Sequence, residues 1–308
     1  MAAKIPFRVA HLKITDHLIL GITQDKIAKG VETFQELDLA CKPMMSWQQV
    51  AGALKEGTVD AAFVLAPTAM DLFKSKVGIR LVLFSHRSGS VLIKNKKANI
   101  NSIEDFRGKV VIIPYQLSVH HMLLHKLCSE ANMTPGAGKD VLLEVMAPSQ
   151  MVEALQYDEE GEIAGFIVAE PFASQAVSMG IGEEFVLSKE IWAEHPCCVL
   201  VVRDEIIQNH PDAVHELTQS LVKSGRFIAA SPSTAARVGA DFLGQKADVV
   251  KHVLTEPPDR ITTNNLFPVI EDLAVIQDYM HDKMGIMQEK IDLEKFVDAR
   301  FAQAAKAT

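Results

Sequence analysis

The sequence contains few cysteines, and none has the C-x-x-C spacing that is typical of zinc or redox sites. The four cysteines are Cys41, Cys128, Cys197 and Cys198. The adjacent pair cannot easily bridge to each other, so a disulfide framework is not expected. We expect all four cysteines to be small, buried hydrophobic residues.

Long apolar runs and an excess of positive charge are also missing. The apolar runs that begin at Val82 and Val110 are far shorter than the roughly 20 residues of a membrane span. The chain has 31 Lys and Arg against 39 Asp and Glu, and its basic residues are scattered. A membrane-spanning segment and a nucleic acid partner are therefore not predicted.

Motifs for common catalytic and cofactor sites are absent as well. The sequence has no G-x-S-x-G, no P-loop, no G-x-G-x-x-G and no H-E-x-x-H, so no cofactor is predicted. His121 and His125 have a helical i, i+4 spacing, but without that last motif they indicate ordinary histidines more than a metal site. His195 near Cys197 is compatible with an activated thiolate, although the apolar run that follows favours a buried strand.

What the chain does contain is an alternation of apolar strands and amphipathic helices over 308 residues, enough for two lobes. The pattern predicts a first strand at residues 7–14, a helix from about 16 to 36, and mainly helices after about residue 212. Two segments resemble each other: a helix, a polar turn and a buried strand that ends at Pro67 recur in the run that ends at Pro171. Continuous apolar strands indicate parallel sheets covered on both faces. The predicted fold class is α/β, with two similar three-layer lobes, a ligand cleft between them and C-terminal helices.

Polar side chains follow the ends of the predicted strands, where ligands collect in open α/β sheets. Glu170 ends a buried strand, and it either lines the cleft, which we favour, or caps the next helix and pairs with a cation. The hydroxyl residues are equally expected as helix N-caps, so the prediction depends on their convergence. The candidate ligand-binding residues are Thr15, Asp16, Ser46, Trp47, Ala66, Thr68, Ser88, Gly89, Tyr115, Gln116, Ser118, His120, Met146 and Glu170.

The order of several segments resembles a known family. These segments are SWQQVAGALKEGTVDAAFVLAP, HRSGSVLI, SIEDFRGKVVIIP, MAPSQMVEAL, VAEPF, EIWAEHPCCVLVVRDEIIQNHPDAV and DLEKFVDARFA. In this order they resemble the substrate-binding proteins of nitrate, sulfonate, taurine and bicarbonate ABC transporters, within the NMT1/THI5-like superfamily. The resemblance covers nearly the whole chain.

The resemblance implies a type II periplasmic-binding-protein fold, in which residues 1–92 and 199–308 form lobe 1 and residues 93–198 form lobe 2. It also implies closure of the two lobes on a small molecule, recognition of the closed form by an ABC permease, and a monomer that is not an enzyme. The chain enters its first strand within about six residues. We therefore expect a cytoplasmic protein if Met1 is the native start, and a periplasmic or outer-face protein if a leader was removed.

Two positions depart from the nitrate-binding branch of this family. Ala193 replaces a lysine that meets the anion there, and Tyr115 replaces a cleft histidine. The predicted cleft contains Asp16, Glu170, Trp47 and Tyr115, with Arg87 as the one candidate cation. This set favours a taurine-like, amine-bearing or heterocyclic solute over nitrate or bicarbonate. A cytoplasmic ligand sensor and an enzyme similar to pyrimidine-precursor synthases remain alternatives.

Overall fold

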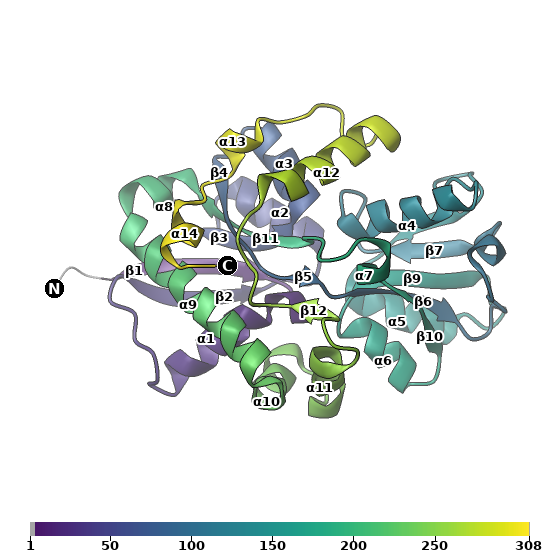
Figure 1. The fold of residues 1–308 in the computed structure, drawn as a ribbon, viewed down its shortest axis with the longest axis horizontal. Coiled ribbons are helices and arrows are strands. Elements are labelled where there is room, and N and C mark those ends of the chain that lie inside the picture. The colour runs from purple at the N-terminus through teal and green to yellow at the C-terminus, as the bar shows by residue number, and fades with distance from the viewer. Residues whose placement is uncertain (1–3, 308) are drawn as a thin grey trace.

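Two fully apolar segments form the centres of two separate five-stranded sheets in the computed structural model, which describes residues 4–307 (Figure 1). The strands β3 (Ala61–Leu65) and β9 (Ile163–Ala169) are buried along nearly their whole length. Strands that are apolar at every position need cover on both faces, and helices supply it in each lobe. We call the two halves lobe 1 and lobe 2.

Lobe 1 is built on the sheet β2-β1-β3-β11-β4, in which β11 runs antiparallel to its neighbours and the other strands are parallel. Its elements before the first crossing are β1 (Ile5–His11), η1 (Thr15–His17), α1 (Leu18–Ala28), β2 (Leu37–Pro43), α2 (Trp47–Glu56), β3, α3 (Ala66–Lys74) and β4 (Ile79–Phe84).

Lobe 2 is built on the sheet β10-β6-β9-β7-β8, in which β6 is the antiparallel strand. Its elements are β6 (Ser90–Asn95), η2 (Ile103–Phe106), β7 (Val110–Ile113), α4 (Val119–Glu130), β8 (Leu142–Val145), α5 (Pro148–Tyr157), β9, α6 (Phe172–Ser178), β10 (Gly182–Leu187) and α7 (Ser188–Ile191).

The two sheets have the same topology when the strand order of one of them is read in reverse. β3 then corresponds to β9, and each has on one side a strand that arrives from the other lobe: β11 in lobe 1 and β6 in lobe 2. The predicted similarity of the runs that end at Pro67 and Pro171 is therefore present in three dimensions. The predicted fold class is confirmed.

Two crossing segments connect the lobes and lie side by side. Arg87 bridges Pro196 in antiparallel fashion, and the Ser88 amide donates to the His195 carbonyl at 2.8 Å. The predicted boundary at residue 92 falls inside β6, because Ser90 already pairs with β9 of lobe 2. Cys198 pairs with β3 of lobe 1. We therefore propose Gly89 and Pro196 as the crossing points.

The chain after the second crossing covers lobe 1 and returns to the crossing segments. Its elements are β11 (Cys198–Arg203), α8 (Asp204–Asn209), α9 (Pro211–Ala230), α10 (Pro232–Leu243), α11 (Ala247–Thr255), β12 (Ile261–Thr262), α12 (Ile270–Asp278), the π-helical turn η3 (Tyr279–Lys283), α13 (Leu293–Phe296) and α14 (Arg300–Ala304). The short strand β12 pairs with β5 (Arg87–Ser88) in the first crossing segment.

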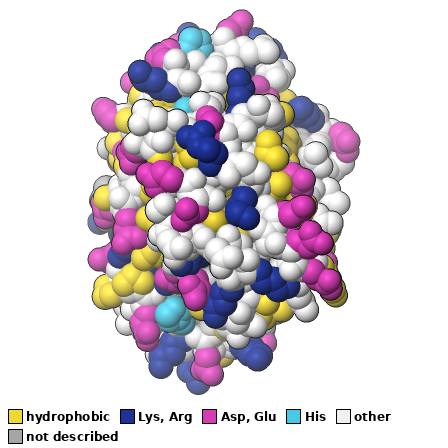
Figure 2. Space-filling model, turned by 90° about the vertical axis from the view of Figure 1, so that its right-hand side faces the viewer, with side chains coloured by type: hydrophobic (Ala, Val, Ile, Leu, Met, Phe, Trp, Pro, Cys, Tyr) yellow, Lys and Arg dark blue, Asp and Glu magenta, His cyan; other side chains and the backbone are white. Residues whose placement is uncertain are grey.

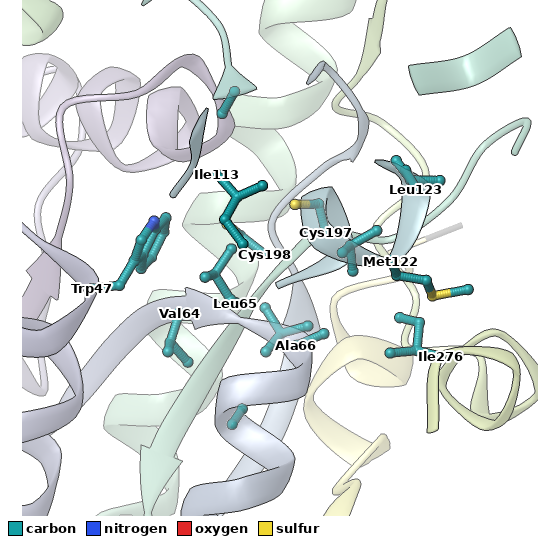
Figure 3. Close-up of a cluster of buried hydrophobic side chains, with 14 of the residues drawn as sticks. Trp47, Val64, Leu65, Ala66, Ile113, Met122, Leu123, Cys197, Cys198 and Ile276 are labelled. Atoms are coloured by element: carbon teal, nitrogen blue, oxygen red, sulfur yellow. The ribbon is translucent and has the colours of Figure 1, made fainter. Parts of the chain in front are cut away.

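One hydrophobic cluster continues across the interface between the lobes. It joins Trp47 and Leu65 of lobe 1 with Ile113 and Met122 of lobe 2, and Cys197 lies among them (Figure 3). The structure is thus a form in which the lobes are in contact.

Two sequence predictions about local structure were wrong. The first long helix ends at Ala28, and an additional strand, β2, follows it. The strand was missed because β2 is an edge strand that is only partly buried, so it lacks a continuous apolar run.

No helix in residues 4–307 is both long and apolar enough to cross a membrane. On the lobe 2 end of the molecule, acidic and basic side chains are interspersed (Figure 2).

Candidate functional site

Four side chains that are far apart in the sequence meet at the carboxyl edge of the lobe 1 sheet. Asp16 follows β1, His86 follows β4, and Cys197 and Cys198 stand where β11 begins. Because β11 runs antiparallel to β4, its first residues lie beside the end of β4. One potential ligand atom from each residue lies within 4.8 Å of the other three. We call these four residues the interlobe cluster.

The interlobe cluster is fully buried and is connected to lobe 2. Asp16 Oδ2 lies 3.0 Å from His86 Nε2, and the Cys198 thiol points at the same oxygen at 3.7 Å. From lobe 2, His120 Nδ1 lies 3.9 Å from Cys197 Sγ, and His120 Nε2 lies 2.9 Å from Ser90 Oγ. The cluster therefore lies at the floor of the interface between the lobes.

Burial and mutual contact shift the pKa values of these groups in different directions. Burial opposes the charge on His86, but the Asp16 carboxylate and Cys197 outweigh it and raise the pKa of His86 to about 10. Contacts with Cys198, His120 and His86 hold the pKa of Cys197 well below its usual value against the effect of burial. Burial, reinforced by Cys197, raises the pKa of Cys198. The site therefore favours an anionic sulfur at Cys197.

Several polar atoms around the cluster have no hydrogen-bond partner within the described part of the chain. They are buried side-chain atoms of residues near the ends of β1 and β4 and before β11: Thr15 Oγ1, Asp16 Oδ1, His17 Nε2, His86 Nδ1 and His195 Nε2. Buried polar atoms are normally paired, because an unpaired one costs about 1–3 kcal/mol. Their concentration at one place indicates a binding site.

A cavity of about 150 Å³ opens between the two lobes. Ser46 and Trp47 line it from lobe 1, and Tyr115 and Met146 line it from lobe 2. Ser46 caps α2 by accepting a hydrogen bond from the Gln49 amide, which orients the start of this helix toward the cavity. Burial, together with Asp71, raises the pKa of Tyr115, so its hydroxyl keeps its proton. We call this space the outer cavity.

Glu170 has a different role from the one that we favoured. Its carboxylate accepts from the Ser174 amide at 2.9 Å and the Ser174 hydroxyl at 2.8 Å, and it pairs with Arg260 at 2.5 Å. Arg260 also pairs with Glu184. Glu170 therefore caps α6 and binds a cation, which was the alternative interpretation of its position. We call this contact the Glu170–Arg260 pair.

Arg87 is likewise engaged elsewhere. It pairs with Asp272 at 2.7 Å and donates to the carbonyls of Glu194 and Asn265. It therefore offers no free cation to a solute between the lobes.

The remaining candidates have backbone or neighbouring partners. The Ala66 amide donates to the Cys197 carbonyl at 2.9 Å, and the Thr68 hydroxyl donates to the Leu117 carbonyl of lobe 2 at 2.8 Å. Ser88 and Gly89 form the first crossing segment, both with positive φ angles.

Two further candidates, Ser118 and Gln116, are also not among the residues that line the outer cavity. Ser118 caps α4 by accepting from the His121 amide, as expected of an N-cap. Gln116 lies on a separate cavity together with His121 and His125.

Sequence reasoning did not identify His86, and it treated Cys197 and Cys198 as core residues. Only the antiparallel pairing of β11 with β4 brings them to Asp16, and no local spacing reports that pairing. The signal that was available was the HPCC segment, in which two cysteines follow a histidine closely.

A family model described as the NMT1-like family matches residues 6–241. The chain belongs to this family. Among curated relatives, the nitrate import ATP-binding protein NrtC of Synechocystis sp. (strain ATCC 27184 / PCC 6803 / Kazusa) is 28% identical over 72% of this chain and 34% of its own length. The chain thus spans about a third of the length of that relative. The taurine-binding periplasmic protein of Escherichia coli (strain K12) is 22% identical over 98% of this chain and 96% of its own.

A solved structure supports the fold. The ligand-binding component of an ABC-type import system from Staphylococcus aureus, solved with zinc bound, superposes with a TM-score of 0.87 at 22% identity. The superposition covers 99% of this chain and 100% of the solved chain. At this identity the likeness shows the fold of the chain.

Proposed function

We propose that this protein captures a small solute between its two lobes and delivers it to an ABC permease. The observation that carries the proposal is the interlobe interface, where unpaired buried polar atoms and a cavity lined by both lobes occur together. The membership of the NMT1-like family and the names of the nitrate and taurine relatives support it.

The lining of the outer cavity favours a neutral or amine-bearing organic solute. No lysine or arginine lies among its lining residues, and Lys13 borders a neighbouring, largely apolar cavity instead. Trp47 and Tyr115 are among its lining residues, and aromatic side chains suit a planar or cationic group. An amine-bearing or heterocyclic compound fits these features better than nitrate or bicarbonate, whose charge no lining side chain would neutralise.

The proposal includes a mechanism of closure. A solute that contacts both lobes stabilises the closed form by the difference between its affinities for the closed and open forms. The permease would then recognise the closed pair of lobes at the periplasmic or outer face of the membrane, as a monomer and without chemical conversion of the solute.

A thermal-shift panel tests this function. The protein is heated with nitrate, bicarbonate, alkanesulfonates, taurine and pyrimidines, each at about a hundredfold above a micromolar affinity. A solute that binds only the folded state should add ~2.7 kcal/mol to the free energy of unfolding. For a chain of 308 residues this corresponds to a rise in the thermal midpoint of roughly 4 °C.

Tyrosine substitutions locate the bound solute. Tyr115→Ala should abolish most of the shift, whereas Tyr157→Ala, at a tyrosine that is 76% exposed, should leave it unchanged. Equal loss in both variants would argue against binding in the outer cavity. If no compound shifts the midpoint and mass spectrometry finds no copurified solute, the transport function fails. A solute that is chemically converted would instead support the enzyme alternative, and a signalling partner would support the sensor.

A further inference from the structure

The interlobe cluster has the composition of a metal site. It presents two cysteine sulfurs, one imidazole nitrogen and one carboxylate oxygen, with the four ligand atoms within 4.8 Å of one another. We propose that Asp16, His86, Cys197 and Cys198 bind a divalent transition-metal ion of the zinc type.

The donor set and its dimensions suit such an ion. Zinc is commonly bound by four sulfur, nitrogen and oxygen ligands in a tetrahedron, at about 2.0–2.3 Å from the ion. Ligand atoms in that tetrahedron are about 3.3–3.8 Å apart, so the cluster needs a contraction on the order of 1 Å to close around the ion. Thiolate ligands also disfavour magnesium and calcium, which prefer oxygen.

Two unpaired atoms point independently to a ligand. Asp16 Oδ1 and His86 Nδ1 are buried and have no hydrogen-bond partner among residues 4–307. The other atom of each group is engaged, because Asp16 Oδ2 lies 3.0 Å from His86 Nε2. Asp16 and His86 therefore each retain one buried polar atom that no residue of the described chain satisfies, which is the expected signature of a ligand site.

An ordinary buried cysteine in the same protein provides the contrast. Cys128 in α4 is buried among apolar side chains, and burial raises the pKa of its thiol to about 12. Cys197 is equally buried, but it lies among polar groups: its Sγ is 3.9 Å from His120 Nδ1, and it belongs to a set of four potential ligand atoms within 4.8 Å of one another. The two cysteines thus differ in what surrounds the sulfur, and only Cys197 has the neighbours that a metal site requires.

The site does not depend on a solute between the lobes. Asp16, His86 and Cys198 belong to the edge of the lobe 1 sheet, and Cys197 directly precedes it. His120 is the contact from lobe 2, at 3.9 Å from Cys197. The ion can therefore bind to lobe 1 whether or not the proposed transport function is correct.

Cobalt titration tests the site directly. The protein, stripped with a chelator and kept reduced, is titrated with CoCl₂ and then with ZnCl₂. We expect one Co²⁺ per chain, a sulfur-to-cobalt charge-transfer band in the near ultraviolet, intense tetrahedral d–d bands in the visible, and loss of all these bands when Zn²⁺ is added. No charge-transfer band, or one that Zn²⁺ does not displace, would overturn the proposal.

Cysteine variants assign the band to the cluster. In Cys198→Ala its intensity should fall by about half, because one of two sulfur ligands is lost, and in the double variant Cys197→Ala/Cys198→Ala it should vanish. The matched control Cys128→Ala should keep the full band. A band that survives in the double variant would place the metal elsewhere and refute the assignment.

Thiol labelling provides a test that needs no variant. The wild-type protein is alkylated with iodoacetamide over time in the presence and absence of Zn²⁺, and the modified peptides are identified by mass spectrometry. Zinc should slow the labelling of Cys197 and Cys198 at least tenfold relative to its effect on Cys41. Equal protection of all three cysteines would contradict a site at the cluster.

Discussion

Two buried carboxylates, Asp16 and Glu170, follow strands that end at the interface between the lobes, yet their surroundings differ. Both oxygens of Glu170 have partners, supplied by Ser174 and Arg260. One oxygen of Asp16 lies beside His86, and the other has no partner in the described chain. A carboxylate at a strand end is therefore a structural element where partners satisfy it, and a candidate ligand where they do not.

The partners also differ in how firmly they hold charge. A guanidinium stays protonated under all ordinary conditions, so Arg260 commits Glu170 to a permanent ion pair. Asp16 raises the pKa of His86 to about 10, but an imidazolium, unlike a guanidinium, can give up its proton when a metal ion takes its place, so His86 leaves Asp16 able to exchange partners. This difference separates a fixed contact from a site that can bind and release.

The largest effect on stability is expected when the Glu170–Arg260 pair is broken. Arg260→Ala leaves the Glu170 charge buried without a partner and should lower the free energy of unfolding by about 3–5 kcal/mol. Urea denaturation, monitored by tryptophan fluorescence, measures this loss in the free energy of unfolding.

A double variant serves as the control for that experiment. Arg260→Met/Glu170→Gln removes both charges and should recover most of the loss. A change below about 1 kcal/mol in Arg260→Ala would contradict a structural role of the pair.

The next largest loss of stability is expected at Gly89, whose backbone hydrogen-bonds to the backbone of both Arg260 and Glu170. The Gly89 amide donates to the Arg260 carbonyl, and the Gly89 carbonyl accepts from the Glu170 amide. Its φ is +90°, and an added Cβ would lie 3.0 Å from the Ile261 side chain. Gly89→Ala should therefore cost roughly 1–3 kcal/mol in the same assay. Gly52→Ala, in a helix with open space, is the control and should cost nothing.

Removing the charge of Asp16 should have little effect on the metal-free protein and a large effect on its stabilisation by zinc. Asp16→Asn should change the stability of the metal-free protein by about 1 kcal/mol or less, because His86 can become neutral. Zinc at a hundredfold excess should add ~2.7 kcal/mol to the wild type and much less to Asp16→Asn. Equal zinc stabilisation of both proteins, measured as thermal midpoints, would remove Asp16 from the site.

The smallest expected effect is a change in the stability of the protein with pH. Burial raises the pKa of Glu170 above its usual value despite Arg260, so protonation of Glu170 on acidification favours the folded state. Burial lowers the pKa values of His11, His17, His121 and His195, so the unfolded chain takes up protons first as the pH falls below about 6.5. Stability should therefore decline from pH 7 toward pH 5.5 because of these histidines.

A single variant checks the source of that decline. His121→Gln should reduce the pH dependence of the thermal midpoint, whereas His252→Gln, at a histidine that is 44% exposed, should not. An unchanged pH profile in His121→Gln would show that the acid sensitivity arises elsewhere.

The fold could be predicted from the sequence because its central strands are apolar at every position. The segments of β3 and β9 have almost no polar residues, and their repetition along the chain indicated two similar lobes. The edge strand β2 was missed because half-exposed strands carry no such pattern.

The site could be predicted only in part. Asp16, Trp47 and Tyr115 were predicted because strand ends and helix starts mark the cleft edge of each lobe, and the structure places them in the interlobe cluster or at the outer cavity. The pairing of Glu170 with Arg260 links residues 90 positions apart. Similarly, His86 meets Cys197 only because the chain returns to lobe 1 as β11. Such contacts depend on topology, and no local motif encodes them.

Anomalous diffraction from crystals grown with Zn²⁺ tests the central distinction most directly. Data collected on both sides of the zinc absorption edge should give one strong peak at bonding distance from the sulfurs of Cys197 and Cys198, from the Asp16 carboxylate and from the His86 ring. No peak should occur at the Glu170–Arg260 pair. A map with no zinc at the cluster, or with zinc only at His121 and His125, would contradict the account.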